Sequence, residues 1–393
     1  MIPHSPRGIV AALAATVTLA VPGTALAQSY GLLEIGSFAH TDVFDVGASE
    51  ISAYDVASQR LFVVNGEVVG LDVLDLSDPT NPTRIDVLSV GSGEVTSCSV
   101  RNNVVAVVAS EGDGLPGTIS FFDATTLEQL GSTFTVGPTP DSVFFSPDGR
   151  TIAIVHEGEP DYEAGLDPDG SIGFFLIDEG VSPDAVAALS AKDLTYARFD
   201  AFNEDKDALI ASGVRIFGDP ENPDGPFGAD AVTVAQDLEP EIITFSADSS
   251  TGWVSLQENN ALAIVDIVNQ EITDVVPLGL ADHSVVGHGI DASDQDGAIN
   301  ITTWPVQGMY MTDSLATYEF EGETFVVFAN EGDDRGDDVR ASELFEAGLL
   351  DLTAFDDPET LFADENLGRL NVTNVDGDLD GDGLIEQLQS FGS

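Results

Sequence analysis

The chain has 393 residues, of which 69 are acidic and 12 are basic, so its formal net charge at pH 7 is -57. Nucleic acids and anionic lipids require a basic surface on the protein that binds them, and this composition therefore excludes both classes of partner. Two causes of the charge stay open: a surface adapted to a saline habitat, and local sites that collect cations.

The N-terminal residues are typical of a secretory signal. Arg7 precedes an apolar stretch at residues 9–21, and Ala25, Leu26 and Ala27 form a cleavage pattern before Gln28. This stretch is too short for a membrane anchor, and no later segment approaches the roughly 20 unbroken apolar residues of a spanning helix. We predict a signal peptide at 1–27, one domain at 28–393, no transmembrane segment, and a secreted, periplasmic or cell-surface location.

Cys98 is the only cysteine, so the exported chain can form no internal disulfide. It lies inside an apolar strand-like segment, where we predict a buried small side chain rather than a reactive thiol. Stability must therefore come from packing, to which a bound metal would add.

A unit of two paired strands and a third strand repeats along the chain. Paired strands are predicted at 50–65, 96–109, 141–156, 241–257 and 313–330, and third strands at 69–76, 117–123, 170–178 and 261–267. Units of about 40 to 50 residues are typical of propeller blades, whereas the strands of a β-sandwich, the alternative fold, do not repeat as units. We predict an all-β fold, a β-propeller of the YVTN/WD40-like kind with about five full blades and the start of a sixth, incomplete at the C-terminus. Insertions are expected at about 182–235, with a short helix at 204–212, and at about 282–311.

Acidic residues recur at one end of each predicted hairpin. Because the two strands of a hairpin are antiparallel, the residue that opens the first strand and the residue that closes the second face the same rim of the central channel. The opening residues are Glu50, Asp141, Glu241 and Asp313, and the closing residues are Glu111, Glu157, Glu258 and Glu331. Such carboxylates ionise together only when a cation lies among them, and an oxygen-only site favours Ca²⁺. A metal-binding rim and a set of solvated loop residues remain the two interpretations.

Arg335 follows the last of these acids. Its guanidinium either holds a phosphate or sulfate beside the metal or pairs with a nearby Asp at 333, 334 or 337.

Residues 376–389 contain a calcium-like loop. Counted from Asp378, the pattern places Asp378, Asp380 and Asp382 at positions 1, 3 and 5, Gly383 at 6, Ile385 at 8 and Glu386 at 9 of an EF-hand loop. Position 12 is Gln389 instead of the bidentate Glu, so weak Ca²⁺ binding is expected. A solvated acidic turn is the alternative.

Several segments resemble the choice-of-anchor I family, in sequence and in order. They are DLEPE at 237–241, LQENNA at 256–261, GIDASD at 289–294, WPV at 304–306 with GMY at 308–310, and NEGD at 330–333. The group includes mesenchyme-specific cell-surface glycoproteins of biomineralising animals and bacterial proteins labelled as atypical alkaline phosphatases. The resemblance covers about residue 47 to the C-terminus and implies a secreted or surface-exposed β-propeller of poorly defined activity.

This chain departs from the family pattern in two ways. His156 stands where the family motif has an Asn-like residue before Glu-Gly-Glu-Pro, and family members continue past the calcium-like segment, so the chain resembles a C-terminally shortened copy.

The sequence therefore favours a secreted calcium-binding β-propeller that acts as a surface or extracellular binding module for divalent cations and for phosphate-containing or matrix ligands. The alternative is a calcium-dependent phosphomonoesterase of the alkaline phosphatase or phytase kind. No motif supplies a nucleophile, which places the enzyme second.

Overall fold

The computed structural model describes residues 31, 33–39, 49, 51–66 and 68–392. The predicted signal peptide and Glu50 lie outside the described residues. No helix among the described residues is long and apolar enough to cross a membrane.

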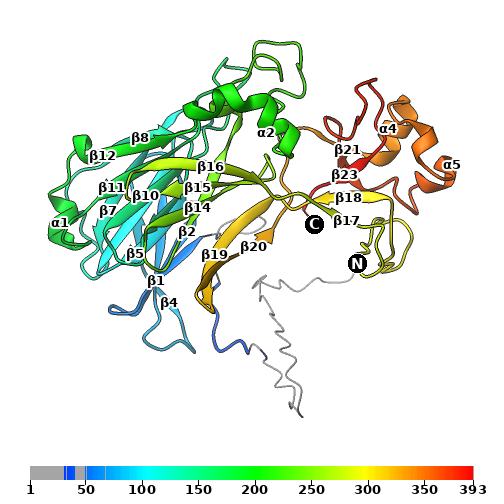
Figure 1. Cartoon of the computed structure of the whole chain (residues 1–393). Coiled ribbons are helices and arrows are strands. Elements are labelled where there is room, and N and C mark those ends of the chain that lie inside the picture. The colour runs from blue at the N-terminus through cyan, green and yellow to red at the C-terminus, as the bar shows by residue number, and fades with distance from the viewer. Residues whose placement is uncertain (1–30, 32, 40–48, 50, 67, 393) are drawn as a thin grey trace.

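Four antiparallel sheets of four strands each form the larger part of the molecule (Figure 1). Within each sheet, strands that are consecutive in the chain are neighbours. The strands are β1 (Ser52–Asp55), β2 (Arg60–Asn65), β3 (Gly70–Asp75) and β4 (Thr83–Ser89); β5 (Glu94–Arg101), β6 (Val104–Ser110), β7 (Pro116–Asp123) and β8 (Phe134–Pro138); β9 (Pro140–Phe145), β10 (Thr151–His156), β11 (Ser171–Leu176) and β12 (Leu194–Arg198); β13 (Pro240–Phe245), β14 (Thr251–Leu256), β15 (Ala261–Asp266) and β16 (Glu271–Pro277).

The first strand of each sheet contacts the first strand of the next. β5 contacts β1 and β9, and β13 contacts β9 and the later strand β19 (Thr312–Phe320). The first strands therefore line a common axis, as the inner strands of a propeller do. This arrangement confirms the predicted all-β propeller.

The fifth blade consists of only two strands, β19 and β20 (Glu323–Asn330). One face packs on the fourth sheet, where the Thr317 hydroxyl donates to the Phe245 carbonyl at 2.7 Å. The opposite face exposes apolar side chains, among them Tyr318 and Phe325, which are stacked with ring centroids 5.2 Å apart. The structure thus has four full blades and one hairpin, where the sequence predicted five full blades and the start of a sixth.

The remaining strands form a separate mixed sheet at the C-terminal side of the molecule (Figure 1). Its order is β17-β18-β23-β22-β21, and β18 runs parallel to β23. The strands are β17 (Leu280–Asp282), β18 (Val306–Met309), β21 (Asp338–Arg340), β22 (Asn371–Thr373) and β23 (Leu388–Ser390), with helices α4 (Ala341–Ala347), η3 (Leu352–Ala354) and α5 (Pro358–Leu361) beside them. The predicted second insertion and the predicted sixth blade are therefore parts of one small subdomain, which has its own apolar core.

The first insertion begins later than predicted, because β12 lies within the range 182–235 and pairs with β11. α1 (Pro183–Ala187) and η1 (Ala191–Asp193) precede β12. The insertion after β12 contains η2 (Asp200–Asp205), α2 (Lys206–Ser212) and α3 (Val234–Asp237). The helix predicted at 204–212 is present as the end of η2 and all of α2, and it ends at Gly213, whose φ is +106°.

Apolar side chains between neighbouring sheets form the propeller core. Cys98 belongs to this core, as predicted, and burial raises the pKa of its thiol to about 12. His156 is fully buried, and desolvation lowers the pKa of its imidazole to about 3, so the ring is neutral. Gly137 and Gly173 leave room for this ring, because an added Cβ would lie 2.6 and 2.8 Å from its atoms.

Arg215 joins the propeller to the C-terminal subdomain. Its guanidinium donates to the carbonyl of Glu258 at 2.6 Å, to Asp376 at 2.7 Å and to Asp337 at 2.5 Å. Asp337 is fully buried, so its charge depends on this partner.

We expect Arg215→Ala to destabilise the protein by about 3–5 kcal/mol, because it leaves the buried carboxylate of Asp337 without a counter-charge. Arg369→Ala is the matched control, since it removes an exposed ion pair with Asp294. Urea unfolding followed by tryptophan fluorescence measures both. Equal midpoints for the two variants would show that Arg215 does not hold the parts together.

Candidate functional site

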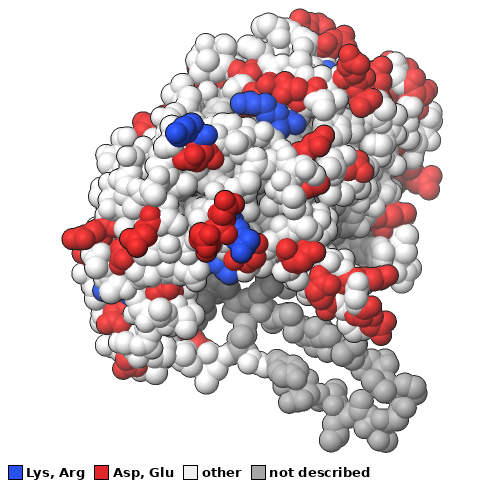
Figure 2. Space-filling view, turned by 60° about the vertical axis from the view of Figure 1, so that its left-hand side comes forward, with Lys and Arg blue, Asp and Glu red and all other residues white. Residues whose placement is uncertain are grey.

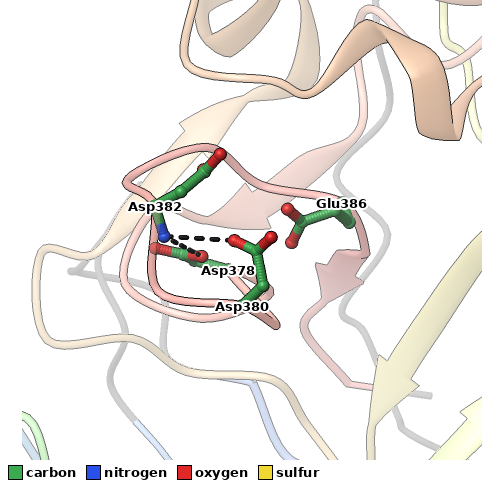
Figure 3. A group of neighbouring side chains, drawn as sticks. All are labelled: Asp378, Asp380, Asp382 and Glu386. Atoms are coloured by element: carbon green, nitrogen blue, oxygen red, sulfur yellow. Dashed lines mark hydrogen bonds between the residues drawn. The ribbon is translucent and has the colours of Figure 1, made fainter.

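The predicted calcium-like loop brings its four acids together. Asp378, Asp380, Asp382 and Glu386 each offer a carboxylate oxygen, and these atoms all lie within 4.8 Å of one another. Figure 3 shows the four side chains around the loop, with the Asp382 backbone N–H donating to both Asp378 and Asp380 at 3.2 Å. These are the residues that the spacing predicted.

Backbone geometry holds the loop in this form. Gly377, Gly381 and Gly383 have φ values of +95°, +78° and +90°, which residues with side chains rarely adopt. Asp378 accepts hydrogen bonds from Gly381 at 2.8 Å and Gly383 at 2.9 Å, and such bonds lower the pKa of its carboxyl.

The far end of the loop is anchored in the C-terminal subdomain. Glu386 reaches back across the loop and accepts from the Leu379 N–H at 2.7 Å. Ile385 is buried, and its backbone bonds to Leu349 and Asp351. Gln389 lies in β23 opposite Gln307, so a strand follows the loop where an EF-hand has a helix. The loop therefore offers four carboxylate groups and no bidentate acid at position 12.

A second acidic group lies at one end of the propeller channel. We call Glu157, Glu239, Glu241 and Glu258 the channel carboxylates. Glu157 follows β10, Glu258 lies two residues after β14, and Glu239 and Glu241 flank the start of β13. Glu239, Glu241 and Glu258 are buried, with 1%, 9% and 4% of their surface exposed, and Glu157 is partly buried.

Burial and mutual repulsion raise the pKa of these groups. Desolvation is the main cause for each of them, and it raises the pKa of Glu239 to about 8. The pKa values of Glu157 and Glu241 are raised well above the usual range, with repulsion from Glu258 and Asp141 adding to burial. The pKa of Glu258 is raised as well. These carboxyls favour the protonated form unless a cation offsets their charge.

Further acids surround this group. Asp141 and Asp313 repel Glu241, and the Gln257 amide, in the orientation that satisfies both of its ends, donates to Glu241 at 2.7 Å. Burial and repulsion from Asp113 raise the pKa of Glu159 to about 7.

Arg335 has other partners than the sequence predicted. Its guanidinium donates to Glu239 at 2.6 Å and to Asp237 at 3.3 Å, instead of to Asp333, Asp334 or Asp337. The cause is the fold, which places the start of β13 beside a segment almost a hundred residues later in the chain. Because both terminal nitrogens already contact carboxylates and the side chain is 9% exposed, the phosphate-holding role gains no support.

Several buried polar atoms in this region have no hydrogen-bond partner. They include Oε2 of Glu258, Nε of Arg335, Oδ2 of Asp167 and Nε2 of His156. A buried polar atom without a partner costs free energy, so each marks a place where a ligand or water would bind favourably.

The structure brings most of the predicted rim to one end of the channel. Asp141, Glu157, Glu241, Glu258 and Asp313 repel one another there, and Arg335 contacts this group through Glu239. Glu331 is exposed beside Gln257, and Glu111 is exposed and accepts a hydrogen bond from Ser92 instead.

The rim prediction did not include Glu239, Asp237 or Glu159. A signal was present, because Glu239 and Asp237 lie two and four residues before Glu241, and Glu159 lies two residues after Glu157. The rim prediction used only acids at the ends of the predicted strands. Asp237, Glu239 and Glu159 do not hold those positions.

A cleft of about 970 Å³ lies beside the loop, between the first insertion and the C-terminal subdomain. Its walls are mainly apolar, with Ile216, Phe217 and Leu280 among them, and the loop-flanking residues Asp376 and Gln389 form part of one side. The face of the molecule in Figure 2 shows acidic side chains in several separate groups and few basic ones.

The acids near the channel make stability depend on pH. The pKa values of Glu159 and Glu239 are raised to about 7 and about 8, mainly by burial, so the folded chain binds protons that the unfolded chain has lost. Their contribution to the free energy of unfolding is complete below the unfolded pKa and is lost as the pH rises through the folded pKa. With a chelator present, we expect the urea midpoint to fall between pH 4.5 and about pH 8.

Glu159→Gln should make this fall shallower, and the exposed Glu179→Gln should leave it unchanged. A wild-type midpoint that stays constant over this pH range would contradict the raised pKa values.

Comparisons with solved structures give only distant similarity. They include a functionally unknown protein from Desulfotomaculum acetoxidans, with 14% identity, a TM-score of 0.37 and coverage of 59% of this chain and 57% of that chain. A nidogen/laminin complex matches with 11% identity, a TM-score of 0.34 and coverage of 60% and 65%. The β-propeller domain of Myceliophteria thermophila Cps50 (Swd1) matches with 14% identity, a TM-score of 0.34 and coverage of 56% of each chain. The chain thus spans less than two thirds of these three proteins.

No curated protein matches the sequence. The model of the choice-of-anchor I domain matches residues 50–393, nearly the whole chain. The chain therefore belongs to the choice-of-anchor I domain family.

Proposed function

We propose that the chain is an extracellular, calcium-binding β-propeller that acts as a binding module at or outside the cell surface. The observation that carries the proposal is the loop, in which four carboxylates lie within 4.8 Å of one another on a backbone fixed by hydrogen bonds. Hard oxygen ligands in this number favour Ca²⁺. Membership of a choice-of-anchor family and the N-terminal signal pattern support the location.

The affinity for Ca²⁺ should be low. Position 12 of the loop is Gln389, which pairs in β23, so the bidentate carboxylate of an EF-hand is replaced by a neutral residue in a strand. Extracellular modules of this kind bind Ca²⁺ with dissociation constants of about 10⁻⁴ to 10⁻³ M. Such a site is filled outside cells, where calcium is abundant, and empty where it is scarce.

Calcium in the loop would act on its surroundings through short contacts. The carbonyl of Gly377 accepts from the backbones of Glu386 and Gln387, and Asp376 directly before it pairs with Arg215. Asp376, Gln389 and Arg215 all line the cleft beside the loop. A bound Ca²⁺ would therefore fix one wall of this cleft, which makes it the best place for a calcium-dependent contact with a partner.

The first test is thermal stability with and without calcium. With a dissociation constant of about 1 mM, 10 mM Ca²⁺ would stabilise the folded chain by about 1.4 kcal/mol, or roughly 2–4 °C in Tm. Asp378→Asn with Asp380→Asn should remove this part of the gain. Calorimetry on chelator-treated protein measures it.

The control for charge is Asp178→Asn with Glu179→Gln, two exposed neighbours at a turn of the third blade. This pair removes the same charge and should keep the full gain. Equal calcium gains in the loop variant and the wild type would refute the loop as a calcium site.

The second test is processing of the N-terminus. We expect the chain recovered from outside the producing cells, or from their periplasm, to begin near Gln28, because Ala25 and Ala27 form the cleavage pattern. Ala27→Phe should block cleavage, whereas Leu26→Ile, which preserves the small residues, should not. Intact-mass spectrometry distinguishes the forms, and a full-length chain retained in the cytoplasm would contradict an extracellular role.

A further inference from the structure

The end of the propeller channel contains more buried carboxyl groups than counter-charges. Arg335 is the cation in contact with the channel carboxylates, and its terminal nitrogens contact Glu239 and Asp237. The negative charges of Glu157, Glu241 and Glu258 must therefore be offset by something other than an ion pair with Arg335. The Gln257 amide donates to Glu241, but an amide carries no charge.

Glu258 gives an independent sign of a missing partner. It is 4% exposed, its Oε2 has no hydrogen-bond partner, and its carboxyl lies within hydrogen-bonding reach of the Glu241 carboxyl. Two carboxyl groups in contact must share a proton or a cation, because neither supplies a donor when ionised. The unpartnered oxygen therefore belongs to a buried carboxyl that contacts the group lacking counter-charge.

We infer that the channel end holds a divalent cation among Glu157, Glu241 and Glu258, separate from the calcium-like loop. This inference does not rest on the proposed function, since it involves different residues. It adds a second metal site on the propeller itself.

The donor set decides the class of ion. The three residues offer only carboxylate oxygens, which favour Ca²⁺ or Mg²⁺ over metals that prefer imidazole or thiolate. The preceding residue, His156, is not included in the site. Its Nδ1 lies 3.2 Å from the Ser171 hydroxyl, and the edge of the ring that carries Nε2 packs against Gly173.

The spacing of the oxygens decides how the ion is held. In the part of the chain that the structure describes, only the loop brings three or more such ligands within 4.8 Å of one another. A cation at the channel end would therefore bind the Glu241 and Glu258 carboxylates directly and reach Glu157 through water. Partly hydrated binding of this kind is usual for divalent ions with few protein ligands.

Exposed acids lie near the channel carboxylates. Glu331, Asp333 and Asp113 are exposed, and Asp333 and Asp113 repel Glu159 beside the channel carboxylates. Like charges around an opening raise the local concentration of cations.

The test counts bound ions in a protein whose loop site is disabled. The full chain with Asp378→Asn and Asp380→Asn is treated with chelator, and Ca²⁺ binding is then measured by titration calorimetry and by Tb³⁺ luminescence as a calcium analogue. We expect this protein to bind one ion per chain. Adding Glu241→Gln and Glu258→Gln should abolish that binding, whereas adding Asp178→Asn and Glu179→Gln should preserve it.

Melting in chelator distinguishes a lost ligand from a lost fold. Glutamine is neutral and similar in shape, and it relieves the repulsion between Glu241 and Glu258, so the channel variant should melt no lower than its parent without calcium. The inference is overturned if the loop-disabled protein binds no ion, which would leave a buried water as the partner of Glu258. It is equally overturned if the channel variant melts as expected and still binds the ion. If the loop does not bind calcium but the channel end does, the wild type binds one ion. Glu241→Gln with Glu258→Gln then removes that ion.

Discussion

Two arginines that both contact one aromatic ring bring distant parts of the chain together. The guanidinium carbons of Arg215 and Arg335 lie 4.6 and 4.2 Å from the ring centroid of Phe217. One arginine pairs with Asp337 and Asp376, and the other with Asp237 and Glu239. In a chain with 12 basic residues, these two bring the first insertion, the fourth blade, the segment after β20 and the calcium-like loop to one place. The loss of either arginine would leave buried carboxylates without a counter-charge, which costs more free energy than the loss of an exposed ion pair.

The sequence indicated the second strands of the blades most clearly, because they are buried on both faces. β6 and β10 are buried at every position, and such apolar runs stand out in the sequence. The outer strands were not predicted. β4 is exposed at all but one of its seven residues, so its apolar side chains do not form a buried face, and its place in the sheet is fixed by its pairing with β3.

The C-terminal subdomain could not be derived from local patterns. β18 and β23 are three or four residues long and pair in parallel although about 80 residues separate them. Parallel pairing at such a distance depends on the whole fold. The sequence analysis instead assigned the chain between the two strands to a fifth blade and the start of a sixth. The same limit applies to Arg335, because local reasoning selects its nearest acids whereas the fold supplies Asp237 and Glu239.

The two candidate sites differ in how far sequence reasoning could go. The loop was predicted residue by residue, since its ligands lie within nine positions and a turn of fixed geometry brings them together. The channel group was predicted only in outline. Antiparallel register places the ends of consecutive strands at one face, but it does not say which acids turn inward; Glu111 faces solvent while Glu258 is buried.

The large acidic excess therefore has more than one physical role. Asp residues at strand ends and turns, such as Asp75, Asp248 and Asp282, accept hydrogen bonds from nearby Ser residues, and these bonds lower the pKa of their carboxyls. Such acids stabilise turns in the ionised form and need no metal. The channel carboxylates are in the reverse situation, because burial raises their pKa and ionisation costs free energy. Dissolved salt screens the exposed acids effectively and the buried carboxyls much less. A habitat rich in salt can thus account for the exposed acids, whereas the buried carboxyls depend on a proton or a bound cation to offset their charge.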